Sequence, residues 1–343
     1  SGLPENSEAV DLQTSSVALM PNQFRGVKPK LMVQEGEEVK IGQQLFFDKT
    51  KPQVKWASPA NGSIKEIKFG PRRVIEKIEI IVDGIDVIKN QVFTKEQIQS
   101  ANREEVLDFI LSSNLFSLIR QRPFNKIANP KDMPRDIFIS GYNTSPLSVD
   151  LQQIIQENKE VFQLGLSALN KLTNGSVYLS IKEAIDFEDV QIQTIYGPHP
   201  AGNVGIQIHH IKPLKPSEVI WTVNAQHVIT LGKLFQTGEY DPSLIISIGG
   251  SGADKPQLVK TITGASIKSM LKNQSLENPI RYISGDVLTG EKVNVDGFMG
   301  FYDSIFTMIN DKVDRPFLGM LSLGSNKTKY SLTNTFISST RSL

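Results

Sequence analysis

The chain has 343 residues, of which 39% are hydrophobic and 21% are charged, and its formal net charge is +1. This length exceeds what a single hydrophobic core usually holds, so we expect two or three domains. A net charge near zero argues against a nucleic-acid binder. The absence of cysteine excludes disulfides, thiolate-held iron–sulfur clusters and thiol catalysis in this chain.

The first organised block lies at residues 30–82, inside an expected first domain at residues 1–97. Glycines interrupt its short, alternating apolar runs at set offsets, a pattern typical of small β-strands joined by tight turns. The block therefore resembles the biotinyl/lipoyl barrel-sandwich domain. Lysines near a predicted hairpin tip do not have the spacing of a carrier domain. We expect a scaffold whose turn lysines stay solvated and unmodified: Lys49, Lys51 and Lys55.

The second block, residues 98–256, alternates helical and strand patterns. Apolar residues recur at helical spacing in three stretches, and the short apolar runs between them are typical of buried strands. Strands that alternate with helices favour a largely parallel sheet flanked by helices, here a Rossmann-like α/β domain. The expected helices are 104–119, 149–171 and 225–235, and the expected strands are 136–140, 177–181, 190–195, 219–223 and 244–248.

The pattern changes again after residue 256. Residues 257–295 combine strand-like runs with a short helix-like run, and they resemble a β-grasp (soluble-ligand-binding) domain. The remaining residues, 296–343, are predicted to form a strand-rich segment with turns at Gly300, Gly319 and Gly324. The sequence as a whole predicts a multidomain α/β protein.

A basic loop is predicted after the first helix of the second domain. It carries Arg120, Arg122 and Phe124, so cations and an aromatic ring lie close together in the sequence. One interpretation is a solvated basic loop. The other is a site for a polar aromatic head group or a contact with an acidic partner.

The segment at residues 196–205 is the most unusual string in the chain. His199 stands between two prolines, which fix the backbone, and Gly202 lets the backbone approach whatever lies beyond. Loops that follow strands are where α/β folds place ligands. A rigid connector whose histidine satisfies a backbone partner would have the same sequence.

Other motifs carry weaker signals. Residues 248–252 follow a predicted strand with three glycines, and they form either a phosphate cradle or a plain turn. His209 and His210 are adjacent and point to different faces, which makes them a poor metal pair. The sequence contains neither a G-x-x-x-x-G-K-[ST] loop nor a G-x-S-x-G elbow.

A resemblance to a known family rests on strings that occur in the same order along nearly the whole chain. The longest, V-x-x-G-Q-x-L-F-x-D-K-x-x-P-x-V-K, spans residues 39–55. Others are R-x-R-P-F-x-K at 120–126, G-P-H-P-A-G at 197–202 and I-S-G-x-V-L-x-G at 283–290. These strings resemble the A subunit of the sodium-translocating NADH:quinone oxidoreductase. The family continues with a further segment, so we expect a chain truncated at its C-terminus.

This resemblance implies a peripheral subunit on the cytoplasmic face of the bacterial inner membrane, in a complex that oxidises NADH, reduces quinone and exports sodium. It also implies that the flavins and the iron–sulfur centre sit on partner subunits and that this chain holds no cofactor, metal or catalytic residue. The domain order further resembles the NADH-oxidising flavoprotein subunit of respiratory complex I. The stretch that corresponds to its glycine-rich flavin loop, Asn114–Phe124, has no glycine. The flavin and NADH sites are therefore expected to be lost.

Three functions follow from these observations. The first is a docking subunit of the membrane complex, with quinone as a candidate ligand. The second is an independent NAD- or flavin-dependent oxidoreductase, which the absent fingerprint disfavours. The third is a relative in an electron-transport complex to ferredoxin, although such relatives carry cysteine clusters. For the first function, we expect one quinone- or partner-binding surface that contains Arg120, Arg122, Phe124, His199 and Gly202.

Overall fold

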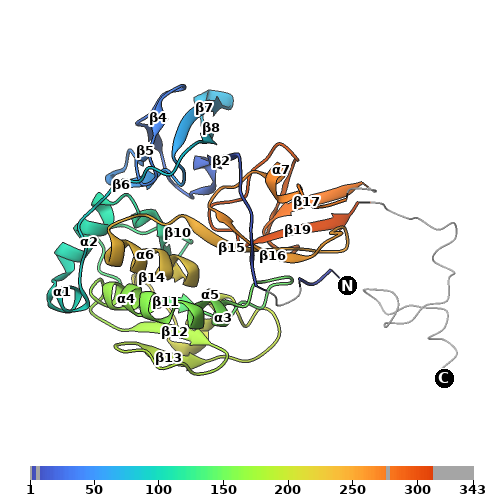
Figure 1. Cartoon of the computed structure of the whole chain (residues 1–343). Coiled ribbons are helices and arrows are strands. Elements are labelled where there is room, and N and C mark those ends of the chain that lie inside the picture. Colours follow the sequence, from blue (N-terminus) through green and yellow to red (C-terminus); the bar gives the residue numbers. More distant parts are fainter. Residues whose placement is uncertain (1, 5–7, 276–278, 312–343) are drawn as a thin grey trace, which may run out of the picture.

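The computed structural model describes residues 2–4, 8–275 and 279–311, which fold into three units (Figure 1). Two small sheets form the first unit, a six-stranded sheet with helices forms the second, and another six-stranded sheet forms the third. No helix among the described residues is both long and apolar enough to cross a membrane. Much of the expected strand-rich segment 296–343, with the turns at Gly319 and Gly324, lies outside the described residues.

The first unit consists of short strands because turns interrupt its apolar runs every few residues. These strands are β2 (Ser16–Leu19), β3 (Pro29–Leu31), β4 (Glu38–Val39), β5 (Gln44–Asp48), β6 (Lys51–Ala57), β7 (Gly62–Phe69) and β8 (Ile75–Val82), with short 3-10 turns at η1 (Pro21–Gln23) and η2 (Pro71–Arg73). The sheets have the orders β2-β8-β7-β4 and β3-β5-β6. They enclose a core in which the rings of Phe46 and Trp56 stack with centroids 4.6 Å apart.

The hairpin between β5 and β6 holds the three lysines considered above. Its turn is closed by the buried Asp48, whose carboxylate accepts the Thr50 N–H at 3.0 Å and the Thr50 hydroxyl at 2.8 Å. Lys51 reaches the second unit, where its Nζ donates to the Ile127 carbonyl oxygen at 3.3 Å, and burial lowers its pKa. The expectation of a solvated side chain is therefore wrong for Lys51, which links two units.

The second unit is a sheet flanked by helices, as the alternating patterns predicted. Its strands are β9 (Ile119–Arg122), β10 (Lys126–Ile127), β11 (Ile137–Ser140), β12 (Val177–Ile181), β13 (Gln191–Thr194) and β14 (Ile220–Asn224). Its helices are α1 (Lys95–Ser100), α2 (Arg103–Ser112), η3 (Phe116–Leu118), α3 (Leu151–Glu157), α4 (Lys159–Asn170), α5 (Val204–Ile211) and α6 (Ala225–Thr237). The strand order is β10-β9-β14-β11-β12-β13. Strands β14, β11, β12 and β13 run parallel, whereas β9 is antiparallel to both of its neighbours.

Helices cover both faces of this sheet. The apolar residues of α3, α4 and α6 join a core that includes Ile137 and Ile139 of β11. On the opposite face, Ile208 of α5 packs with Phe138 and Ile220. Burial on both faces explains why the central strands have nearly continuous apolar sequences.

Two expected helices are interrupted by asparagine. The helix predicted over 104–119 stops at the end of α2. It does not continue because Asn114 adopts a φ of +61° and its side chain donates to the Gly42 carbonyl oxygen at 3.0 Å. The run 149–171 is split into α3 and α4 at Asn158, whose Nδ2 donates to the Ile154 carbonyl oxygen at 2.9 Å. Local side-chain hydrogen bonds of this kind compete with the helical backbone.

The third unit is a sheet of order β1-β16-β15-β19-β17-β18. Its strands are β1 (Val10–Asp11), β15 (Ser243–Gly249), β16 (Gln257–Ile262), β17 (Ile280–Ser284), β18 (Glu291–Val293) and β19 (Ile305–Asn310), and its helix is α7 (Ile267–Met270). The strand predicted at 244–248 was expected in the second unit, but as β15 it pairs with β16 and β19. The short connection from β15 to β16 favours this antiparallel pairing, which alternation along the chain does not reveal. β1 also joins this sheet, although it lies in the expected first domain.

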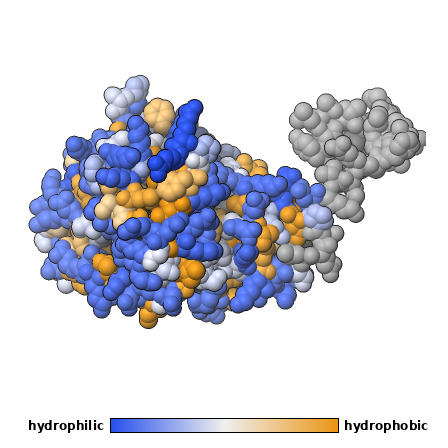
Figure 2. Space-filling view, turned by 90° about the horizontal axis from the view of Figure 1, so that it is seen from above, coloured by the Kyte–Doolittle hydropathy of each residue, from blue (hydrophilic) through white to orange (hydrophobic). Residues whose placement is uncertain are grey.

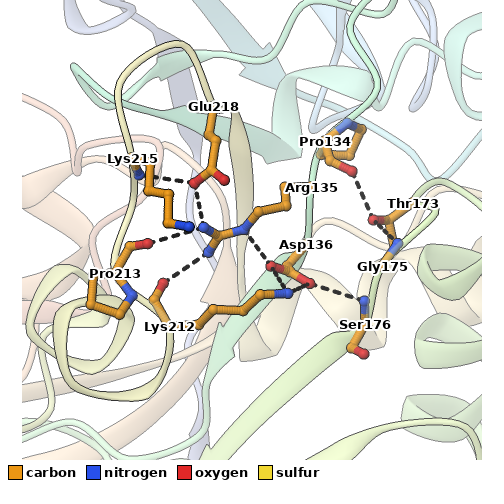
Figure 3. A network of polar contacts seen from close by, with 10 residues as sticks. All are labelled: Pro134, Arg135, Asp136, Thr173, Gly175, Ser176, Lys212, Pro213, Lys215 and Glu218. Atoms are coloured by element: carbon orange, nitrogen blue, oxygen red, sulfur yellow. Dashed lines mark hydrogen bonds and ion pairs between the residues drawn. The ribbon is translucent and has the colours of Figure 1, made fainter.

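A buried carboxylate holds the amino ends of the parallel strands of the second unit (Figure 3). Asp136 is fully buried and accepts hydrogen bonds from Arg135 Nε at 2.7 Å, Lys212 Nζ at 2.8 Å and the Ser176 N–H at 3.1 Å. Because Lys212 follows α5 and Ser176 precedes β12, one carboxylate ties three elements together. Arg135 is fixed in turn by Glu218, which also accepts a hydrogen bond from it.

Replacing this carboxylate should destabilise the second unit. We expect Asp136→Asn to lower the free energy of unfolding by about 3 kcal/mol, at the low end for a broken buried ion pair, because Lys212 is partly exposed. Urea unfolding followed by circular dichroism measures the change. Asp108→Asn, on the exposed face of α2, is the matched control and should shift stability by less than about 0.5 kcal/mol. Equal effects of the two substitutions would contradict this role of Asp136.

Candidate functional site

The parallel sheet of the second unit reverses its winding between β11 and β14. From β11 the chain moves to β12 and β13 on one side, then returns through α5 to β14 on the other side of β11. Open α/β sheets bind ligands at the carboxyl ends of strands at such a reversal. Ser140 and Asn224 end these two strands, and both line a pocket of about 530 Å³, which we call the switch pocket.

Arg120 and Arg122 lie on β9 and not on the predicted loop. Because alternate residues of a strand point to the same face, the two side chains share one face, and both line the switch pocket. In the ladder with β14, Arg120 is opposite Thr222 and Arg122 is opposite Ile220. The Cζ atom of Arg120 also lies 4.5 Å from the centroid of the Tyr302 ring, a cation–π contact with the third unit.

Nearby carboxylates do not neutralise these two guanidinium groups. None of the ion pairs among the described residues includes Arg120 or Arg122. The described residues that line the pocket include no Asp or Glu. Burial, and then the charge of Arg120, lowers the pKa of Arg122, although an arginine stays protonated at neutral pH.

Two further titratable groups lie near Arg120, namely His227 and Asp303. Burial lowers the pKa of His227 to about 3, so this imidazole stays neutral. Burial also raises the pKa of Asp303, whose carboxylate accepts a hydrogen bond from the Ser284 hydroxyl at 2.6 Å. The described lining of the switch pocket therefore carries two cations and no carboxylate.

Gly202 and the start of α5 form another wall of the pocket. A Cβ atom on Gly202 would lie 2.4 Å from Thr144 N and 2.7 Å from the Tyr142 carbonyl oxygen, so only glycine permits this close approach of two loops. The Gly202 N–H donates to Thr144 Oγ1 at 2.9 Å. Asn203, the N-cap residue directly before α5, makes no side-chain capping hydrogen bond.

Two of the predicted site residues lie outside the pocket lining. His199 is half-buried, and its Nδ1 lies 3.3 Å from Thr144 Oγ1, so the imidazole fastens its loop to the neighbouring one. Phe124 follows β9 and is 65% exposed. Its carbonyl oxygen accepts a hydrogen bond from Arg25 at 3.2 Å. The structure thus brings Arg120, Arg122 and Gly202 together around one pocket, but not His199 or Phe124.

The sequence did not identify the polar strand residues of the pocket. Thr222 lines the pocket and is only 2% exposed, and its Oγ1 is buried without a hydrogen-bond partner. Its place beside Arg120 depends on pairing between strands that are far apart in the chain, so no local pattern reveals it. Ser140 and Asn224 did carry a signal, because each is a polar residue at the end of an apolar run.

The glycine-rich segment 248–252 is a turn whose N–H groups bond to carbonyl oxygens of the same chain. The Gly250 N–H donates to the Gly2 carbonyl oxygen at 2.9 Å, and the Gly252 N–H donates to the Met308 carbonyl oxygen at 2.9 Å. These N–H groups are already used, which supports the plain turn over the phosphate cradle. Within the described part of the chain, no group of His, Asp or Glu residues is placed to hold a metal ion.

Three family models match the chain in sequence order. They describe the NqrA N-terminal barrel-sandwich hybrid domain at residues 1–83, the NqrA second alpha/beta domain at residues 101–240 and the NQRA C-terminal domain at residues 245–295. The first match confirms the predicted barrel-sandwich domain. The third begins inside β15, in agreement with the placement of that strand in the third sheet.

Solved structures show only a distant likeness. Two structures of an NAD+-reducing NiFe hydrogenase, in the H2-reduced and air-oxidized states, give TM-scores of 0.37 and 0.41 at 9% and 8% sequence identity. They cover 52% and 61% of this chain and 41% and 47% of their own chains. This likeness is too weak to support an argument about function.

Curated relatives match over almost the entire chain. The A subunit of the Na(+)-translocating NADH-quinone reductase from Pasteurella multocida (strain Pm70) is 35% identical over 345 residues, which cover 98% of this chain and 76% of the relative. The same protein from Pseudomonas aeruginosa (strain UCBPP-PA14) is 35% identical, with coverage of 98% and 76%. That from Yersinia pestis is 36% identical, with coverage of 93% and 72%. The chain therefore belongs to the NqrA family, which forms the A subunit of the Na(+)-translocating NADH-quinone reductase.

Proposed function

We propose that the chain is a noncatalytic subunit that docks on the other subunits, including the membrane subunits, of a complex that couples NADH oxidation and quinone reduction to sodium export. In this proposal the subunit lies peripherally at the cytoplasmic face of the bacterial inner membrane. The flavins and the iron–sulfur centre belong to partner subunits. The observation that carries the proposal is the switch pocket, where Arg120, Arg122 and Gly202 meet at the reversal of the sheet.

We further propose that the second unit is Rossmann-like and that the third is a β-grasp (soluble-ligand-binding) unit. The order β14-β11-β12-β13, with helices on both faces, supports the first assignment. A small mixed sheet against which α7 packs through Ile267 and Met270 supports the second.

The stretch that corresponds to a flavin loop supports the absence of a redox centre in this chain. Within Asn114–Phe124, the side chains of Leu115, Phe116 and Leu118 are buried in the core. Side chains that fill this space prevent the close backbone approach that a flavin phosphate needs. The sequence also has no cysteine to hold an iron–sulfur cluster.

The switch pocket and its rim suit a quinone head group or a docking segment. Quinone carbonyl oxygens accept hydrogen bonds, and the guanidinium groups of Arg120 and Arg122 can donate them. The exposed Phe124 offers an aromatic anchor for a partner near the end of β9. His199 acts as a positioning residue, because it holds the loop that carries Gly202.

The purified chain should carry no chromophore. We expect the visible spectrum after extensive dialysis to lack flavin bands, since the chain offers no glycine-rich flavin loop and no cluster ligands. Absorbance measured before and after addition and removal of FMN checks this expectation. Flavin bands that survive dialysis would sink the proposal of a noncatalytic subunit.

Substitutions in the pocket should weaken quinone binding or assembly while the fold survives. We expect Arg122→Ala to weaken either quinone binding or the association with the other subunits by about 2 kcal/mol, roughly thirtyfold, as for an interface arginine. His199→Ala should have a smaller effect, because it acts through the loop. Short-chain quinone titration and co-purification with the other subunits measure the losses, and circular dichroism checks the fold.

The matched control for these substitutions is Arg73→Ala. Arg73 is an exposed arginine in the turn between β7 and β8, and it belongs to none of the ion pairs among the described residues. It should leave quinone binding and assembly unchanged. Normal assembly and turnover of both Arg122→Ala and His199→Ala would contradict the proposed site.

A further inference from the structure

Neither arginine of the switch pocket belongs to an ion pair among the described residues, and the pocket lining adds no carboxylate. Arg120 and Arg122 are two residues apart on one face of β9, so their charges repel each other. Solvent would screen such a pair on an open surface. Arg122 Nε, however, is buried and has no hydrogen-bond acceptor. Arg122, which lines the pocket, therefore keeps one N–H donor without a partner.

Thr222 is a second, independent observation at the same place. Thr222 lines the pocket, its side chain is almost fully buried, and its buried hydroxyl has no hydrogen-bond partner. Buried hydroxyls are nearly always hydrogen-bonded, so an unpartnered one requires an explanation. Because Thr222 is opposite Arg120 in the ladder, an acceptor that binds the arginines also lies within the neighbourhood of this hydroxyl.

The start of α5 adds a third source of positive potential at the pocket. Val204 and Gly205 line the pocket, and the first N–H groups of a helix have no acceptor within the helix. The helix dipole gives this end a partial positive charge. Asn203 does not cap it through its side chain, and the space around a Cβ position on Gly205 is open.

We propose that the switch pocket binds an anionic group, a phosphate or a carboxylate, between the arginines of β9, the Thr222 hydroxyl and the start of α5. This inference rests on the proposed function, which makes this pocket the ligand site. A neutral quinone carbonyl would accept hydrogen bonds but would leave both positive charges uncompensated. A phosphate or carboxylate accepts these hydrogen bonds and also compensates the positive charge, because arginine binds such groups with paired, charge-assisted hydrogen bonds.

The anionic group has two possible sources. It belongs either to a free small molecule or to a partner subunit that inserts an acidic group into the pocket. The pocket volume of about 530 Å³ lies in the range of small-molecule sites and exceeds the size of a phosphate alone. Both sources place the same chemistry on the same donors, so one set of variants tests them.

The direct test is calorimetric titration of the full chain with inorganic phosphate and, separately, with acetate at constant ionic strength. We expect phosphate to bind the unsubstituted chain and Arg122→Gln to weaken it by about 10- to 100-fold, the loss typical of a hydrogen bond to a charged group. Thr222→Val should also weaken binding. Its melting temperature should stay the same or rise, because the substitution removes a buried hydroxyl without a partner.

The Arg73→Gln control and the melting temperature of Thr222→Val distinguish anion binding from a purely structural role of these residues. Arg73→Gln removes an exposed arginine elsewhere and should leave phosphate affinity unchanged. A purely structural Thr222 would lower the melting temperature and leave the affinity unchanged when substituted. The proposal is overturned if neither phosphate nor acetate binds, or if Arg73→Gln weakens binding as much as Arg122→Gln.

A reconstitution arm identifies the source of the group. If a partner subunit supplies the anionic group, phosphate should inhibit rebinding of the chain to a complex from which this chain has been removed. The Arg122→Gln variant should then fail to rebind. If the anionic group belongs to a free small molecule, neither phosphate nor the Arg122→Gln substitution should affect this rebinding. Titration with a short-chain quinone without phosphate tests the proposed function separately. Quinone binding without anion binding would overturn this inference alone, whereas anion binding by a chain that neither binds quinone nor joins the complex would overturn the proposed function alone.

Discussion

β14 pairs in parallel with β11 on one side and antiparallel with β9 on the other, and this double pairing sets the geometry of the switch pocket. The first pairing places Ser140 beside Asn224 at the carboxyl edge of the sheet. The second turns Arg120 and Arg122 toward the same pocket. A shift of β9 by one residue would turn both arginines to the opposite face, because side chains alternate along a strand. The register of β9 on β14 is thus a condition for the site.

Charged side chains of this sheet differ in whether a partner of opposite charge accompanies them. At the amino edge, Asp136 is buried but paired with Arg135 and Lys212, so its charge contributes to the fold (Figure 3). On β9, the positive charges of Arg120 and Arg122 have no paired carboxylate among the described ion pairs. Unpaired buried charge destabilises a protein, and perturbed groups of this kind cluster at functional sites. Paired charge thus supports the fold, whereas the unpaired arginines line the switch pocket. Figure 2 shows apolar patches among hydrophilic ones on one face of the molecule.

The sequence revealed the features that depend on local pattern. The central strands were predicted because burial on both faces makes their runs apolar, and the family was recognised because short strings keep their order. β9 was missed because Ile119–Arg122 is half polar, and its strand conformation comes from pairing with the distant β14. Thr222 was missed for the same reason. The strand at 244–248 was predicted but misplaced, because its partner sheet depends on long-range packing.

The central claim is that the switch pocket is a ligand site of a subunit that works in a complex. An electron cryomicroscopy map of the assembled complex that contains this chain tests it most directly. We expect density for a phosphate or carboxylate, from a ligand or a partner subunit, within hydrogen-bonding distance of Arg122 and Thr222. A switch pocket that contains only water and lies far from every other subunit would contradict the account.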